Sequence, residues 1–167
     1  MRSTTLVSIP VGVVVERRRA KSVWAEFLWR PVSVLAGKPS AEPWTVLDVQ
    51  AESVLFYAGE AVIELHRTES TYYRDNLACD TPRLWVVLSP TGSDPPYELL
   101  TVTVDPAEGE GFTDAGNNLV ETVPMPQDIL VIVGQFIATH HVERSFIKRR
   151  RQPAEFGRQK DGQGNET

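Results

Sequence analysis

Cysteine is almost absent from this sequence, since Cys79 is the single example among 167 residues. No disulfide can form within the chain, and there is no cysteine pair for a zinc site. Aromatic residues are also scarce at 8%, whereas 41% of residues are hydrophobic and 23% are charged. This balance is typical of an ordinary globular protein and excludes a disulfide scaffold. A lone cysteine favours a reducing compartment, so the predicted location is the cytoplasm.

Long hydrophobic runs are missing as well. The apolar stretch at residues 6–15 is interrupted by Pro10 and Gly12, and it is about half the ~20 residues that a spanning helix needs. The arginines at 17–19 follow this stretch, whereas the charges of a secretion leader precede it. We therefore expect a buried strand here, with no membrane span and no leader.

The motifs of common catalytic chemistries do not occur. There is no glycine-rich phosphate loop, dinucleotide-binding fingerprint or serine elbow in the sequence. The acidic residues within 105–114 lack the register and closing glutamate of a calcium-binding hand, so they are expected to cap a helix and face solvent. We predict no cofactor and no metal, and a non-enzyme is favoured.

What the chain does contain is a series of short segments rich in β-branched residues. Strands are predicted at residues 7–15, 27–35, 44–49, 54–57, 61–66, 84–88, 97–104 and 118–123. Gly59 is expected to form a turn between two of them. Their close spacing indicates antiparallel pairing. The predicted fold is α+β, with one antiparallel, strongly bent or barrel-like sheet of six to eight strands.

Helical patterns occur at three places. Residues 68–77 carry a helix-start signature, but their β-branched and aromatic content limits the helix to one or two turns. Asp105, Pro106 and Glu108 form an N-terminal cap for a short helix over residues 106–115. A long C-terminal helix is predicted over 126–142 from apolar residues at helical spacing. This stripe contains Ile129, Ile132, Val133, Phe136, Ile137 and His140.

Charge is divided unevenly along the chain. Residues 1–143 carry 10 Lys+Arg and 19 Asp+Glu, whereas residues 144–167 carry 7 and 3. The formal charges are therefore −9 and +4, which together give −5. We expect residues 1–147 to form a single domain and residues 148–167 a basic, disordered tail. Clustered cations beside an acidic domain are typical of an interaction segment, so partner binding is assigned to them. They are Arg144, Lys148, Arg149, Arg150 and Arg151.

Four further side chains are candidates for chemistry: His66, Cys79, His140 and His141. Adjacent histidines on a helix point about 100° apart, so His140 and His141 do not easily bind one ion. The favoured interpretation places His140 on the apolar stripe and His141 in water. Cys79 follows a predicted helical turn with two arginines nearby in sequence, a setting that lowers a thiol pKa when the charges are close. An ordinary unreactive cysteine is the favoured alternative.

The four tryptophans, Trp24, Trp29, Trp44 and Trp85, have two interpretations. They line a ligand pocket or they pack in the core, and the core is favoured. Nucleic-acid binding is disfavoured, because the basic tail has no interleaved aromatic residues and the domain is acidic.

Eight ordered segments carry a family resemblance. They are IPVGVVVERR (9–18), WRPV (29–32), YAG (57–59), ELHR (64–67), YRDNL (73–77), LWVVL (84–88), PPYE (95–98) and HHVERSFIKR (140–149). Together they make the chain, over about residues 7–150, resemble an uncharacterised bacterial family known as a domain of unknown function.

This resemblance implies a role more than a mechanism. Members are encoded beside formate dehydrogenase genes, iron-sulfur proteins and molybdoenzyme chaperones, and some are labelled molybdopterin-guanine dinucleotide biosynthesis protein. A nucleotidyltransferase of that type opens with a glycine-rich phosphate loop in a Rossmann-like unit, and this chain has neither. The expected function is a non-catalytic accessory or assembly factor for a molybdenum-dependent formate dehydrogenase or related redox enzyme. It would dock on an enzyme subunit or its chaperone through its surface and basic tail.

Two alternatives stay open from the sequence. One is a small enzyme or carrier that binds a molybdopterin-type anion. The other is a sequence-independent nucleic-acid-binding regulator.

Overall fold

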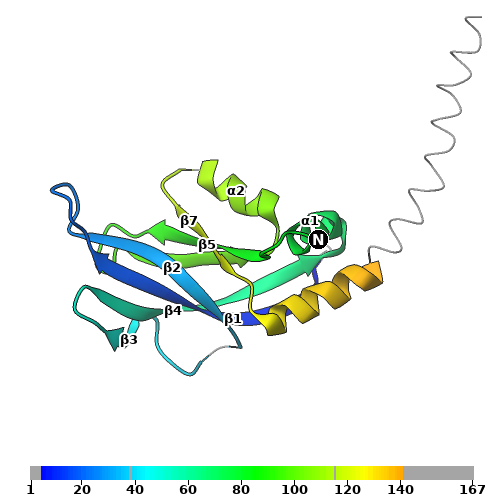
Figure 1. Cartoon of the computed structure of the whole chain (residues 1–167), viewed down its shortest axis with the longest axis horizontal. Helices are drawn as coiled ribbons and strands as arrows, with labels where there is room; N and C mark the ends of the chain where they lie inside the picture. Colours follow the sequence, from blue (N-terminus) through cyan, green and yellow to red (C-terminus); the bar gives the residue numbers. More distant parts are fainter. Residues whose placement is uncertain (1–4, 38, 115, 141–167) are drawn as a thin grey trace, which may run out of the picture.

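The computed structural model describes residues 5–37, 39–114 and 116–140 (Figure 1). In these ranges, seven strands form two antiparallel sheets, with the orders β2-β1-β4-β3 and β6-β5-β7. The strands are β1 (Thr5–Arg19), β2 (Phe27–Ala36), β3 (Thr45–Val49), β4 (Ser53–His66), β5 (Arg83–Pro90), β6 (Tyr97–Thr103) and β7 (Leu119–Pro124). The helical segments are η1 (Arg67–Glu69), α1 (Ser70–Leu77), α2 (Pro106–Asp114) and residues 127–140.

The α+β class and the antiparallel pairing are confirmed, but the single bent or barrel-like sheet is wrong. Backbone pairing stops at His66, where β4 ends and the chain enters η1 and α1. These helical turns carry the chain out of the first sheet, so β5 begins a second one. The sheets face each other with β6 beside β4 and β7 beside β2, and they do not close into a barrel. The predicted end of the last helix, residue 142, lies outside the described residues.

The turn expected at Gly59 is also wrong, because β4 continues through it. Gly59 has a φ of 142°, a conformation that L side chains rarely adopt. The β1–β4 register shifts here: Val13 pairs with Gly59, and Val14 pairs with Tyr57. Ala58 is thus an extra residue in the ladder, which is a β-bulge. The strand persists because β1 pairs with both of its halves.

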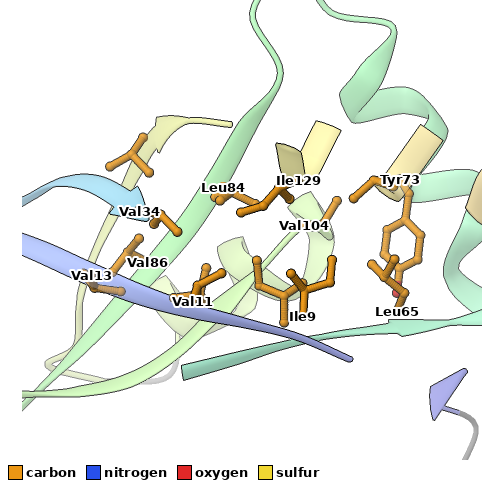
Figure 2. Packing of buried hydrophobic residues seen from close by; sticks show 14 of the residues in the cluster. Ile9, Val11, Val13, Val34, Leu65, Tyr73, Leu84, Val86, Val104 and Ile129 are labelled. Atoms are coloured by element: carbon orange, nitrogen blue, oxygen red, sulfur yellow. The ribbon is translucent and has the colours of Figure 1, made fainter. Parts of the chain in front are cut away.

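The core lies between the two sheets (Figure 2). Alternate residues of β1 and β5 supply its centre, as expected for strands whose inward faces are covered. They are Ile9, Val11, Val13, Val15, Leu84, Val86 and Leu88, and none is more than 5% exposed. Each such side chain contributes roughly 1.5–3 kcal/mol when fully buried.

Helical residues complete this core. Ile129, Val133 and Phe136 of segment 127–140 are buried in it. Trp85 is half-buried on the other face of β5, where α2 covers it, and a Cβ on Gly109 would overlap its side chain. None of the helices in the described ranges is both long enough and apolar enough to cross a membrane.

Candidate functional site

A polar cleft of about 540 Å³ opens where β4 passes into η1 and α1. Its lining brings one predicted candidate, His66, close to several carboxylates. The residues are His66, Thr68, Glu69, Tyr72, Tyr73, Asp105, Ala107 and Glu108. The cleft is therefore the first place to look for acid–base chemistry.

Tyr73 forms the floor of this cleft and has a structural role. It is 1% exposed, and its Oη accepts a hydrogen bond of 2.9 Å from the backbone N–H of His66. Burial raises the pKa of Tyr73 to about 12, and the Asp105 carboxylate adds to the effect. The phenol is therefore neutral at physiological pH and does not act as a base.

Asp105 and Glu108 are engaged in capping α2. Asp105 Oδ1 accepts a 2.9 Å hydrogen bond from the Ala107 N–H, so the predicted N-cap is confirmed. Glu108 takes part in this cap through a third residue: the Asp105 N–H donates to Thr103 Oγ1 at 3.1 Å, and that hydroxyl donates to the Glu108 carboxylate. Burial raises the pKa of Asp105. These two carboxylates thus stabilise the start of α2.

The predicted chemical candidates do not assemble into a centre. His66 Nε2 lies 3.8 Å from Glu64 Oε1, whereas Cys79 is exposed and, like His140, does not line the cleft. His140 packs its ring on Phe136, with the centroids 4.5 Å apart, as expected for a member of the apolar stripe. Over the described part of the chain, no cluster of three or more His, Cys, Asp or Glu could hold a metal.

Six of the predicted site residues have no structural account. His141 and the proposed partner-binding residues Arg144, Lys148, Arg149, Arg150 and Arg151 all lie outside the described residues.

The opposite end of the molecule has a different character. We call residues 17–28 and 45–54 the hairpin end, since they comprise the tip of the β1–β2 hairpin and the adjoining β3–β4 hairpin (Figure 1). Val23 and Trp24 at this tip are 93% and 92% exposed. The core position favoured for Trp24 is therefore wrong. The hairpin extends past the second sheet, so its tip has no layer to pack against.

Strand β3 adds a second exposed apolar element to the hairpin end. All five of its residues are exposed, among them Val46, Leu47 and Val49. It pairs with β4 on one side, and no other described strand pairs with its free edge. The other outer strand of this sheet, β2, lies beside β7. An edge strand of this kind can accept an added strand through its backbone groups, although the Thr45 N–H already donates to the Glu42 carbonyl at 3.2 Å.

Between these elements, two arginines lie on aromatic rings. The Arg17 guanidinium carbon is 4.5 Å from the centroid of Phe27, 5.4 Å from Phe56 and 5.8 Å from Trp29. Arg19 lies 5.8 Å from the Phe27 centroid. These distances are typical of cation–π contacts, which fix the guanidinium groups without neutralising them.

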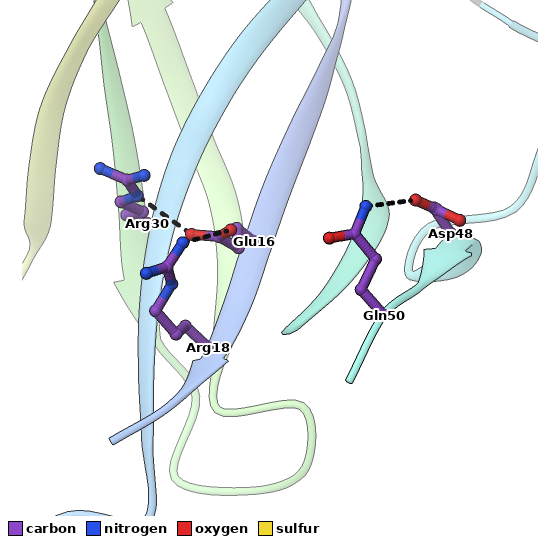
Figure 3. Close-up of polar contacts among 5 residues, drawn as sticks. All are labelled: Glu16, Arg18, Arg30, Asp48 and Gln50. Atoms are coloured by element: carbon purple, nitrogen blue, oxygen red, sulfur yellow. Dashed lines mark hydrogen bonds and ion pairs between the residues drawn. The ribbon is translucent and has the colours of Figure 1, made fainter. Parts of the chain in front are cut away.

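The neighbouring arginines on the other face of the sheet are paired (Figure 3). Glu16, which is 8% exposed, lies between Arg30 at 3.1 Å and Arg18 at 3.6 Å. Among the described residues, neither Arg17 nor Arg19 has a carboxylate within ion-pair distance. Arg18 and Arg30 are thus paired with Glu16, whereas Arg17 and Arg19 have no ion-pair partner among the described residues.

Sequence reasoning missed the hairpin end. It weighed the arginines at 17–19 only as part of a leader, and the tryptophans only as core or pocket. A signal was present: residues 17–21 hold four cations in a chain of net charge −5, and Trp24, Phe27 and Trp29 follow directly. A group of cations followed closely by aromatic residues is typical of protein interfaces.

Comparison with known families gives the identity that the fold alone does not. Residues 10–151 match the family described as Protein of unknown function (DUF3305). The chain belongs to this family. Membership of a domain-of-unknown-function family was the expectation from the ordered segments, whereas the genomic context and the molybdopterin-related labels stay predictions. Searches among curated proteins and among solved structures find no match.

Proposed function

We propose that this member of the DUF3305 family is a non-catalytic docking protein whose hairpin end binds a protein partner. The observation that carries the proposal is the exposure of Val23 and Trp24 at the hairpin tip. Tryptophan is among the residues that contribute most to protein–protein binding when it becomes buried. The two adjacent apolar side chains are 93% and 92% exposed, so they contribute little to the stability of the fold, but they can anchor a complex.

Strand β3 supports the same function. An extended partner segment can hydrogen-bond to its free edge, and the exposed side chains of Val46 and Val49 offer apolar contacts along that edge. The bulge between Val46 and Asp48 and the strand's length of five residues limit unspecific pairing of this edge.

The proposed partner is a subunit of a molybdenum-dependent formate dehydrogenase or related redox enzyme, or the chaperone of such a subunit. This identity rests on the family resemblance of the ordered segments, while the geometry of the hairpin end supports the class of activity. The protein would then act in assembly of the enzyme.

The cleft gives less support to the alternative of an enzyme or carrier for a molybdopterin-type anion. Three carboxylates, those of Glu69, Asp105 and Glu108, line it and would repel an anion. Its buried Tyr73 and its capping Asp105 already take part in the internal hydrogen bonds of the fold.

Co-purification tests the docking function. The full chain would be expressed with formate dehydrogenase subunits, either unchanged or as the double variant Val23→Ser, Trp24→Ser. Both side chains are exposed, so we expect an unchanged melting temperature and at least a tenfold loss of recovered enzyme subunit. Tyr72→Ser, an aromatic truncation at the cleft, is the matched control and should leave recovery unchanged. Full recovery with the double variant, or loss with Tyr72→Ser alone, would reject the hairpin end as the docking surface.

A further inference from the structure

We propose that Arg17 and Arg19 form a carboxylate-binding site for an acidic segment of the protein partner. This inference rests on the docking function proposed above and specifies the chemistry of the partner. The site adjoins the exposed tip, because Arg19 also lines the surface hollow around Val23 and Trp24.

The site is a small pocket of about 70 Å³ between the two hairpins. Its walls come from the end of β1, the start of β2 and the β3–β4 turn. They are Arg17, Arg19, Phe27, Gln50, Ala51, Glu52, Ser53 and Val54. A pocket of this size accommodates a carboxyl group and not a whole cofactor.

The hydrogen-bonding groups of Arg17 indicate how a ligand would be bound. Arg17 Nε is buried and has no hydrogen-bond partner among the described residues. Because Nε is out of reach of solvent, a ligand would contact the terminal N–H groups of Arg17 instead. The ring centroids of Phe27 and Phe56 lie 4.5 Å and 5.4 Å from the Arg17 guanidinium carbon, and the N–H groups lie in the guanidinium plane. A carboxylate that approaches in that plane can accept hydrogen bonds from the two terminal nitrogens.

Charge complementarity favours an acidic protein segment over a phosphate polyanion or an anionic membrane. Residues 17–21 carry four cations, although the chain as a whole has a net charge of −5. Glu52 lines the pocket itself, and Glu26 lines the adjoining hollow. A continuous anionic surface would meet these carboxylates and the acidic body, and it would be repelled. A short acidic segment with apolar residues can contact the two arginines and the exposed tip without meeting the rest of the acidic body.

Glu52 is an acidic residue of the pocket itself, so replacing it is expected to have the opposite effect to replacing the arginines. It lines the pocket, and its backbone oxygen accepts a 2.9 Å hydrogen bond from the Arg19 N–H. Its carboxylate lies beyond ion-pair distance of both arginines, and a like charge in the same pocket disfavours a second carboxylate. Replacing Glu52 by Gln should therefore strengthen binding, in contrast to replacing the arginines.

The probe is a fluorescein-labelled octaglutamate peptide, and binding is followed by anisotropy at low salt. The full-length chain carries Lys148, Arg149, Arg150 and Arg151 as Gln, so that the basic tail does not bind the probe. In this background we expect at least a fivefold loss of affinity for Arg19→Gln and at least a threefold loss for Arg17→Lys, which keeps the charge but lacks the planar fork. Glu52→Gln should raise affinity at least twofold.

Arg30→Gln is the matched control, since Arg30 is paired with Glu16 on the opposite face of the sheet. Equal losses for Arg30→Gln and Arg19→Gln would show unspecific attraction and overturn the site. Unchanged affinity in Arg19→Gln and Arg17→Lys would overturn it too. The site is likewise rejected if Arg19→Gln abolishes binding to phosphatidylserine vesicles and leaves octaglutamate binding intact.

Enzyme co-purification separates this inference from the docking function. If Val23→Ser, Trp24→Ser loses the enzyme subunit while Arg19→Gln and Arg17→Lys recover it fully, only the carboxylate site is rejected. If the tip double variant also recovers it fully, the docking function itself fails.

Discussion

The two ends of this molecule differ in how far their side chains are buried and hydrogen-bonded. At the helix end, which we define as α1 and residues 127–140 with the strands beneath them, Phe136 and Tyr73 are 4% and 1% exposed. At the hairpin end, Trp24 is 92% exposed and Arg17 Nε has no described partner. Burial and hydrogen bonding at the helix end account for stability. The hairpin end gains little from its largest side chain, so its composition is better explained by binding.

The largest expected difference between the two ends is in the loss of stability when one aromatic side chain is truncated at each. Phe136→Ala removes a buried ring that packs on Tyr73 with centroids 6.0 Å apart. We expect it to lower the free energy of unfolding by about 3–5 kcal/mol, through lost apolar transfer and a cavity. Trp24→Ala should change it by less than about 0.5 kcal/mol. Urea denaturation measures both, and similar losses at the two sites would refute the division.

Asn76 sharpens the comparison for polar groups. Its amide joins α1 to β5 and to the residue after β6, donating to the carbonyls of Arg83 at 2.7 Å and Val104 at 2.9 Å and accepting from the Arg83 N–H at 3.0 Å. Asn76→Ala leaves these groups unpaired, and we expect a loss of about 2–4 kcal/mol. Asn117→Ala, at an exposed bend, is the control and should change the free energy of unfolding by less than about 0.5 kcal/mol. A loss below about 1 kcal/mol for Asn76→Ala would mean that water replaces these bonds.

Tyr73 gives the smallest of these effects, together with a pH signature. Its pKa is raised to about 12 from 10.0, so its contribution to stability is complete below pH 10 and is lost as the pH rises from 10 to 12. Tyr73→Phe should cost about 1 kcal/mol at pH 7, because the His66 N–H loses its acceptor. The variant should also lose less stability than the wild type between pH 10 and 12. Tyr72→Phe, at an exposed position, should follow the wild-type pH profile. Parallel profiles for Tyr73→Phe and wild type would contradict the burial of this phenol.

Much of the fold was predictable, because strands and helix caps depend on residues that are close together in the sequence. The segment predicted at 27–35 is β2, at 27–36, and the Asp105 cap begins α2 at Pro106. The division into two sheets was not predictable in this way, since it depends on where η1 and α1 carry the chain in space. Gly59 shows the same limit: a glycine with positive φ serves a turn or a bulge, and only the pairing with β1 decides which.

The proposed binding surface was harder to predict than the fold. Tryptophan is buried in most proteins, so core packing was the favoured interpretation of Trp24, and only the length of the hairpin beyond the second sheet exposes it. The separation of Arg17 from Glu16 onto opposite faces follows from strand alternation, but the pairing of Glu16 with Arg30 requires the register of β1 and β2. The candidate His66 does lie in a cleft with carboxylates, yet the buried members of that cleft hold the fold together.

Amide hydrogen exchange on the complex with the co-purified enzyme subunit tests the central claim most directly. We expect slower exchange on binding in residues 17–28 and 45–54, and little change at 66–77 and 127–140. Protection confined to the cleft-forming residues 66–77 and 105–108, with the hairpin end exchanging as in the free protein, would contradict the assignment of the two ends.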